Sequence, residues 1–211
     1  QLPLGKHDLA QRAYEIERIE LKMNGGRQDQ YAAAFGGFNY IEFKKDGHVV
    51  VTPLHLEKNF VNDLSYYLVL FYMKSSRASA NIIARQQEQV RKGKIEAIEA
   101  THALKAFTCD VKDALMKRDL EQIGALMHHS WQNKKKLTNH ITNAKIDALY
   151  AAALEAGAIG GKISGAGGGG FMIFCCPKHT RSQVIQALQK IGGKAFPYAF
   201  VDHGVERWTS I

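Results

Sequence analysis

Two acidic residues near the start of the chain, Glu17 and Asp29, are candidates for metal binding or catalysis. Glu17 falls in line with the apolar stripe of a first helix, whereas Glu15 falls on its polar side. A carboxylate on a burying face needs a partner, and a metal ion or a basic side chain would serve. Asp29 follows a Gly-Gly break and precedes a small-residue run that permits close packing. An arginine partner for Glu17 and a helix-capping role for Asp29 are the structural alternatives.

A second stretch that could do chemistry is GGKISGAGGGGFMIF, residues 160–174, which contains seven glycines before an apolar run. Glycine inside regular structure costs roughly 0.5–1 kcal/mol relative to alanine, so the cluster needs a geometric reason. Successive N–H groups of a glycine loop form a concave anion site. A tight glycine turn packed against a neighbouring element is the alternative. The pattern is not a Walker loop, since no Gly-Lys-Ser/Thr follows.

Composition narrows the choice of partners. The 211 residues are 45% hydrophobic and carry a net charge of +8, which is spread along the chain. The densest basic cluster, NKKKLT at 133–138, is more typical of a solvated helix surface than of a nucleic-acid site. Phosphorylated small molecules are therefore the expected acidic partners, with no nucleic acid and no membrane. Three cysteines without metal spacing indicate a reducing cytoplasm.

The positioning elements follow from periodicity and turn signals. Helices are expected from Lys6 to about Leu21, over 77–93 and 96–117, after a capping box at Asp119, over 146–154, and near 180–192. Strands are expected at 38–43 and 48–54, which form a hairpin, and at 64–72, 162–164, 170–176 and 195–201. From residue 64 onward this order predicts the split βαβ arrangement of a ferredoxin-like α+β sandwich.

Several blocks in this order resemble the GHMP kinases, the superfamily of galactokinase, homoserine kinase and mevalonate kinase. The blocks are GGRQDQYAAAFGGFNYIEF and GGKISGAGGGGFMIF, with AYEIER upstream and SW followed by KKKL at 130–137. Within the superfamily the chain most resembles the D-glycero-D-manno-heptose 7-phosphate kinases. The resemblance runs over nearly the whole chain. It implies ATP and Mg²⁺ as cofactors.

The resemblance also implies roles for individual residues. Asp29 matches the proposed catalytic base and Glu17 the carboxylate that binds magnesium. Substrate contacts are expected at Gly26, Arg27, Gln28 and Arg77. The loop on the phosphate side comprises Ser164, Gly165, Gly167, Gly168, Gly169 and Gly170. Basic residues near these motifs, among them Lys162, could meet a second phosphate of the substrate.

One departure from the family concerns the nucleotide. The Gly-Leu-Gly-Ser-Ser-type loop that precedes the first helix in the family is absent here. We therefore expect residues 1–62 to be the end of a GHMP kinase N-terminal domain and 63–211 to be its ferredoxin-like C-terminal domain. The chain then needs a missing N-terminal segment and does not turn over ATP by itself. A galactokinase- or fucokinase-like enzyme and a non-catalytic binding domain are the alternatives to a heptose 7-phosphate kinase.

Overall fold

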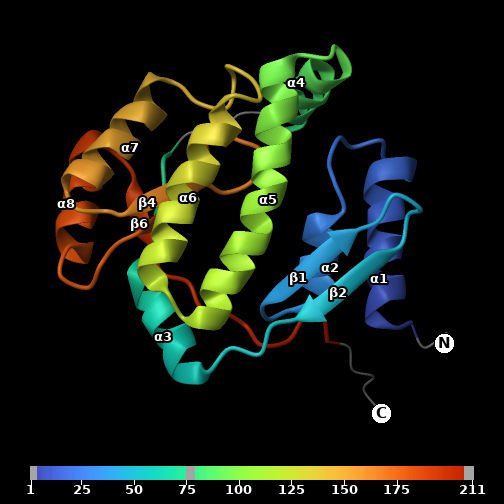
Figure 1. Ribbon diagram of the computed structural model, residues 1–211, viewed down its shortest axis with the longest axis horizontal. Coiled ribbons are helices and arrows are strands. Elements are labelled where there is room, and N and C mark those ends of the chain that lie inside the picture. The colour runs from blue at the N-terminus through green and yellow to red at the C-terminus, as the bar shows by residue number, and fades with distance from the viewer. Residues whose placement is uncertain (1–3, 75–78, 207–211) are drawn as a thin grey trace. The chain divides into compact units, whose positions relative to one another are not determined.

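The contacts within the chain define two compact units. The computed structural model describes residues 4–74 and 79–206 (Figure 1). Unit 1 comprises Gln1–Glu57 together with Ala199–Ile211, and unit 2 comprises Lys58–Tyr198. The family boundary expected after residue 62 remains a prediction. Within the described residues, no helix is both long and apolar enough to cross a bilayer.

Unit 1 combines helices with a hairpin. Its elements are α1 (Lys6–Tyr14), the π-helix η1 (Glu15–Glu20), α2 (Gln28–Phe35), β1 (Asn39–Phe43) and β2 (Val49–Pro53). The hairpin is confirmed, with Ile41 opposite Val51 in antiparallel register. Inward side chains of the hairpin pack on a small core of Ala10, Tyr31 and Ala34. This packing holds α1 and α2 together, and these helices carry the two acidic residues.

The first helix changes its winding halfway along. A single regular helix from Lys6 to Leu21 is wrong, because Glu15–Glu20 forms a π-helix. The N–H of Leu21 donates to the carbonyl of Ile16 at 2.9 Å, five residues back. This wider winding moves side chains off the line expected for 3.6 residues per turn. Leu21, expected on the buried stripe, is 64% exposed.

Unit 2 has a four-stranded antiparallel sheet. Its elements are α3 (Lys58–Tyr67), β3 (Leu68–Tyr72), α4 (Ser79–Arg91), α5 (Ile95–Lys117), α6 (Leu120–Lys135), α7 (Ala144–Glu155), β4 (Gly160–Ile163), β5 (Phe171–Cys175), α8 (Arg181–Ile191) and β6 (Lys194–Phe196). The strand order is β4-β5-β3-β6. This order and the sequence of elements confirm the split βαβ arrangement.

Two strands of unit 2, β3 and β6, are four residues shorter than expected. Residues 64–67 belong to α3, so β3 has only five residues. The strand expected at 195–201 ends at Phe196 because Pro197 has no N–H to continue the ladder. Tyr198 then turns inward, and its hydroxyl donates to the carbonyl of Ser65 at 3.0 Å.

The long helices of unit 2 form a side-by-side pair in Figure 1, α5 and α6. Arg118 ends α5 in a left-handed conformation with φ 59°. Asp119 then caps α6 by accepting a hydrogen bond from the N–H of Gln122 at 2.9 Å, which confirms the predicted cap. The inner face of α6 joins a core centred on the sheet, whose fully buried side chains include Trp131, Phe71, Phe174, Ile163 and Leu149. Through this packing α6 is fixed against β4.

Candidate active site

Glu17 lies in η1 and is engaged by two neighbours. Its Oε2 accepts a hydrogen bond from Gln30 Nε2 at 2.7 Å and lies 3.2 Å from Nη2 of Arg18. The Glu17 side chain is 41% exposed and that of Glu15 is 36% exposed, so Glu17 is not the more buried of the two. The expectation of a burying face for Glu17 is therefore wrong. The arginine alternative is confirmed in the form of Arg18.

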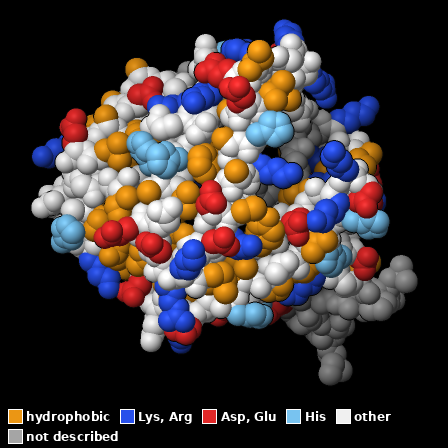
Figure 2. All heavy atoms as spheres, in the orientation of Figure 1, with side chains coloured by type: hydrophobic (Ala, Val, Ile, Leu, Met, Phe, Trp, Pro, Cys, Tyr) orange, Lys and Arg blue, Asp and Glu red, His pale blue; other side chains and the backbone are white. Residues whose placement is uncertain are grey.

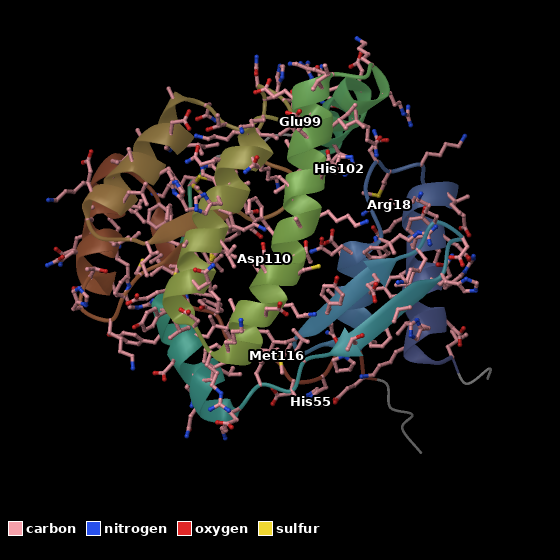
Figure 3. All side chains as sticks on the ribbon, viewed as in Figure 1. Arg18, His55, Glu99, His102, Asp110 and Met116 are labelled. Carbon is pink, nitrogen blue, oxygen red and sulfur yellow. The ribbon has the colours of Figure 1, made fainter. Side chains whose placement is uncertain are left out.

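Arg18 connects this carboxylate to the loop before α2. Its guanidinium is largely buried, and Nε donates to the carbonyl of Gly26 at 3.2 Å. Figure 3 labels Arg18, which lies beside the loop that joins η1 to α2. An added Cβ at Gly25 would meet the Arg18 guanidinium carbon at 2.4 Å, so the loop backbone passes directly over this side chain. Arg18 thereby fixes the loop that carries the residues expected to contact the substrate.

Asp29 is exposed in the first turn of α2 and does not cap that helix. Arg27 occupies the cap position without a side-chain cap bond, so the capping alternative for Asp29 is wrong. A carboxylate in a first helical turn is stabilised by the positive end of the helix dipole. The next residue, Gln30, bonds to Glu17. One hydrogen bond therefore joins η1, with Glu17, to the helical turn that carries Asp29.

The residues expected to contact the substrate differ in how much they are held. The guanidinium of Arg27 donates to the carbonyl of Gly47 at 2.9 Å and lies over the ring of Tyr14. Gly26 and Gln28 are exposed, and an added Cβ at Gly26 would meet nothing within 4 Å. Arg77 lies outside the described residues. Open space beside Gly26 therefore adjoins Arg27, whose side chain is held by two contacts.

The oxygen atoms around Glu17 fit a single contact with a hard cation. Among the described residues no donor reaches Glu17 Oε1, and the buried Oε1 of Gln30 has no hydrogen-bond partner. Mg²⁺ prefers oxygen ligands and takes only one or two carboxylates from protein, with water and phosphate completing the shell. No group of three His, Cys, Asp or Glu side chains that could hold a metal occurs in residues 4–74 and 79–206. The residues around Glu17 could therefore supply one carboxylate ligand to a Mg²⁺ ion, but not a complete coordination shell.

The glycine loop in unit 2 has the backbone geometry that the sequence suggested. Five of its glycines have positive φ angles: Gly165, Gly167, Gly168, Gly169 and Gly170. Such angles are open to glycine and strained for other residues, which accounts for much of the glycine content. Ser164, at the start of the loop, is exposed and its N–H donates to the carbonyl of Phe171 at 2.8 Å.

The loop is tied to the rest of unit 2 at several backbone groups. The N–H of Gly168 donates to the carbonyl of Ile141 at 2.7 Å, and the carbonyl of Gly170 accepts from the N–H of Met73 at 2.9 Å. Gln86 Nε2 donates to the carbonyl of Ala166 at 3.1 Å. An added Cβ at Gly167 would stand 3.1 Å from Ile141, so the loop packs closely there. The positive φ angles and the close packing at Gly167 agree with a tight glycine turn against a neighbouring element, and the anion-binding role of the loop stays a prediction.

Comparisons with known proteins identify the family to which the C-terminal part of the chain belongs. The family described as GHMP kinases C terminal matches residues 111–194, which run from α5 through the glycine loop to β6. The chain is 37% identical over 210 residues to a D-glycero-alpha-D-manno-heptose 7-phosphate kinase of Campylobacter jejuni. That match covers 98% of this chain and 60% of the relative, so the chain spans less than two thirds of the relative's length.

The chain carries a GHMP kinase C-terminal domain. A crystal structure of a D-glycero-D-manno-heptose 1-phosphate kinase from Bacteroides thetaiotaomicron matches with a TM-score of 0.73 and 36% identity, over 99% of this chain and 57% of that chain. A mevalonate kinase of L. major in complex with R-mevalonate matches with a TM-score of 0.69 at 19% identity, over 90% of this chain and 56% of that chain. This second likeness shows the fold alone.

Sequence reasoning missed one feature of this GHMP kinase C-terminal domain. The basic cluster at 133–138 is not a uniformly solvated surface, because Lys134 is partly buried and its Nζ donates to the carbonyl of Gly165. The spacing of the apolar residues in α6 could have indicated that Lys134 is partly buried. Ile123, Met127 and Trp131 follow each other at four-residue steps on its buried face, and Lys134, three residues after Trp131, falls on the same face of the helix.

Proposed function

We propose that the complete protein transfers the γ-phosphoryl group of ATP to the anomeric hydroxyl of D-glycero-D-manno-heptose 7-phosphate, with Mg²⁺. The observation that carries this proposal is the 37% identity over 98% of the chain to a relative named for that substrate. ATP is the phosphate donor expected of a kinase. We place the protein in the cytoplasm, where sugar phosphates and ATP occur together.

In this proposal Asp29 is the general base. Its carboxylate is exposed at the start of α2, where an attacking hydroxyl can reach it. Acceptance of the hydroxyl proton by such a group typically contributes about 10²–10⁴-fold to a rate. Gly26, Arg27 and Gln28 precede Asp29 and would orient the sugar. The contacts of Arg27 with Tyr14 and Gly47 support an orienting role.

Glu17 would hold the magnesium ion through Oε1, while Arg18 and Gln30 keep Oε2 in place. The bound ion would neutralise charge on the phosphates during transfer. Phosphoryl transfer depends mainly on positioning and charge neutralisation, so this chain needs no nucleophilic triad. Ser164 and the glycines of the loop would offer N–H groups to phosphate oxygens. The positive φ angles of that loop support this role.

A galactokinase-like activity is the second candidate. A galactokinase of Enterococcus faecalis is 35% identical over 103 residues, although this match covers only 46% of the chain. The heptose assignment is favoured because its relative matches twice as much of the chain. If the protein is instead a non-catalytic binding domain, it should bind the ligand without phosphorylating it.

The test is a comparison of substrates with the complete protein. Initial rates would be measured with ATP, Mg²⁺ and each of heptose 7-phosphate, heptose 1-phosphate, galactose, fucose and mevalonate. The proposal expects the highest kcat/KM for heptose 7-phosphate and formation of a heptose bisphosphate. A preference for an unphosphorylated sugar or mevalonate would overturn it. If only heptose 1-phosphate is phosphorylated, the acceptor is a hydroxyl other than the anomeric one.

A further inference from the structure

Two lysines lie together beside the glycine loop. Lys134 stands near the C-terminal end of α6, and its Nζ donates a hydrogen bond to the carbonyl of Gly165. Lys162 stands in β4, three residues before Gly165. Both side chains are partly buried. Lys134 therefore contacts the start of the loop from a helix, and Lys162 lies on the strand that leads into the loop.

The strand geometry explains why Lys162 faces α6. An added Cβ at Gly160 would meet the carbonyl oxygen of Gly124 at 2.2 Å and the Cβ of His128 at 2.8 Å, so that position faces α6 at close range. Side chains alternate along a strand, so Lys162 projects from the same face as Gly160. Ile163, on the opposite face, is fully buried in the core. The small size of Gly160 lets the helix and strand come close enough to place Lys162 near Lys134.

The electrostatics of the pair are unfavourable as it stands. Burial, together with the smaller effect of the nearby positive charge of Lys162, lowers the pKa of Lys134 to about 8. Burial also lowers the pKa of Lys162. No carboxylate forms an ion pair with either lysine within the described part of the chain. Buried charges are normally paired, so a pair of neighbouring cations without an anion calls for a ligand.

The loop beside the lysines offers further donors. Among the described residues, no acceptor is found for the N–H groups of Gly165, Gly167 and Gly169. Free N–H groups of a glycine loop can contribute donors to an anion-binding concavity. Two ammonium groups and this backbone together present positive charge and donors without a competing acceptor side chain. The oxygens of a phosphate group are negatively charged and accept hydrogen bonds, so they complement both the positive charge and the donors.

We propose that Lys134 and Lys162 together form a binding site for a phosphate group, with the two ammonium groups neutralising its two negative charges. The site lies where the glycine loop begins, and the backbone N–H groups supply its remaining donors. The source of the phosphate rests on the proposed function: it is the phosphate ester carried by the sugar substrate, with the phosphates of ATP as the other source. In both cases the site recognises a tetrahedral dianion.

The experiment measures binding of inorganic phosphate to the complete protein by titration calorimetry. Lys134→Gln and Lys162→Gln are compared with wild type, and Lys136→Gln, an exposed neighbour on the same cluster, is the matched control. Loss of one charge-assisted contact should weaken phosphate binding about 10-fold or more. Lys162→Arg keeps the charge and should retain most of the binding. Circular dichroism confirms that each variant is folded.

Competition then identifies the source. Heptose 7-phosphate that displaces inorganic phosphate in wild type but not in Lys134→Gln supports the sugar phosphate, and displacement by ATP alone supports the nucleotide. Phosphate binding that is absent in wild type, or equal in Lys134→Gln, Lys162→Gln and Lys136→Gln, overturns the site. Lysine-dependent phosphate binding without any sugar phosphorylation would instead overturn the proposed function and leave this site standing.

Discussion

Replacement of Lys134 by methionine should change how the stability of the protein depends on pH. The folded state holds this ammonium group partly buried near Lys162, whereas the unfolded chain exposes it to water. The folded pKa is lowered to about 8 from 10.5, so between these values the unfolded chain binds more protons. Stability therefore rises with pH across this window and is lowest below pH 8.

The size of the effect follows from the two pKa values. A lysine that titrates near 8 when folded and near 10.5 when unfolded makes the folded state about 3 kcal/mol less stable below pH 8 than above pH 10.5. Methionine removes this cost and also removes the hydrogen bond to Gly165, which is lost at every pH. The stability of Lys134→Met relative to wild type should therefore fall by roughly 2–3 kcal/mol between pH 7 and pH 10.

Urea unfolding at pH 7 and pH 10 measures this difference. The fluorescence of Trp131, which is fully buried in unit 2, reports unfolding when Trp208 is replaced by phenylalanine. Lys136→Met, at an exposed position, should stay within about 0.5 kcal/mol of wild type at both pH values. If Lys134→Met loses the same amount of stability at both pH values, the buried ammonium has no electrostatic cost and the reasoning fails.

Three further predictions concern the acidic residues and the helix–strand contact. In the complete enzyme, Asp29→Asn should lower kcat by about 10²–10⁴-fold with Mg-ATP affinity nearly unchanged, and a folded variant with most of its activity would exclude the base role. Glu17→Gln should raise the Mg²⁺ concentration for half-maximal rate, while Glu15→Gln should not; equal behaviour of the two variants contradicts the metal role. Gly160→Ala should lower the free energy of unfolding, measured with urea, by about 1–3 kcal/mol, because the added Cβ would stand 2.2 Å from a carbonyl oxygen of α6. An unchanged midpoint would show that α6 and β4 separate freely.

Elements with local signals could be predicted from the sequence. The hairpin of β1 and β2 has a turn sequence between two β-rich runs, and α6 begins where Asp119 caps it. The apolar run at 64–72 predicts a single strand from sequence, because periodicity does not distinguish helix from strand in a short apolar run. In the structure Phe60 and Leu64 lie four residues apart on the buried face of α3, and the chain becomes a strand only at Leu68.

The parts of the candidate site that belong to sequence motifs could be predicted, whereas the contacts that depend on packing could not. The glycine loop was found by composition, and its positive φ angles follow from residue type. The partners of Glu17 depend on the π-helix, which the 3.6-residue pattern does not reveal. Lys134 was missed because a run of lysines suggests solvent, whereas its burial depends on the packing of α6 against β4. Arg77 and its expected substrate contact lie outside the described residues.

The return of the C-terminal segment to unit 1 bears on how the protein folds. The N–H of Val205 donates to the carbonyl of Ala33 at 3.1 Å, and the N–H of Gly37 donates to the carbonyl of Val201 at 2.9 Å. These bonds join residues separated by most of the chain, and contacts of high sequence separation slow folding through the entropy of loop closure. During synthesis unit 2 emerges from the ribosome before unit 1 has all of its residues. Unit 1 is thus discontinuous in sequence, with unit 2 inserted between its two segments, and a truncation before residue 199 would remove these hydrogen bonds from unit 1.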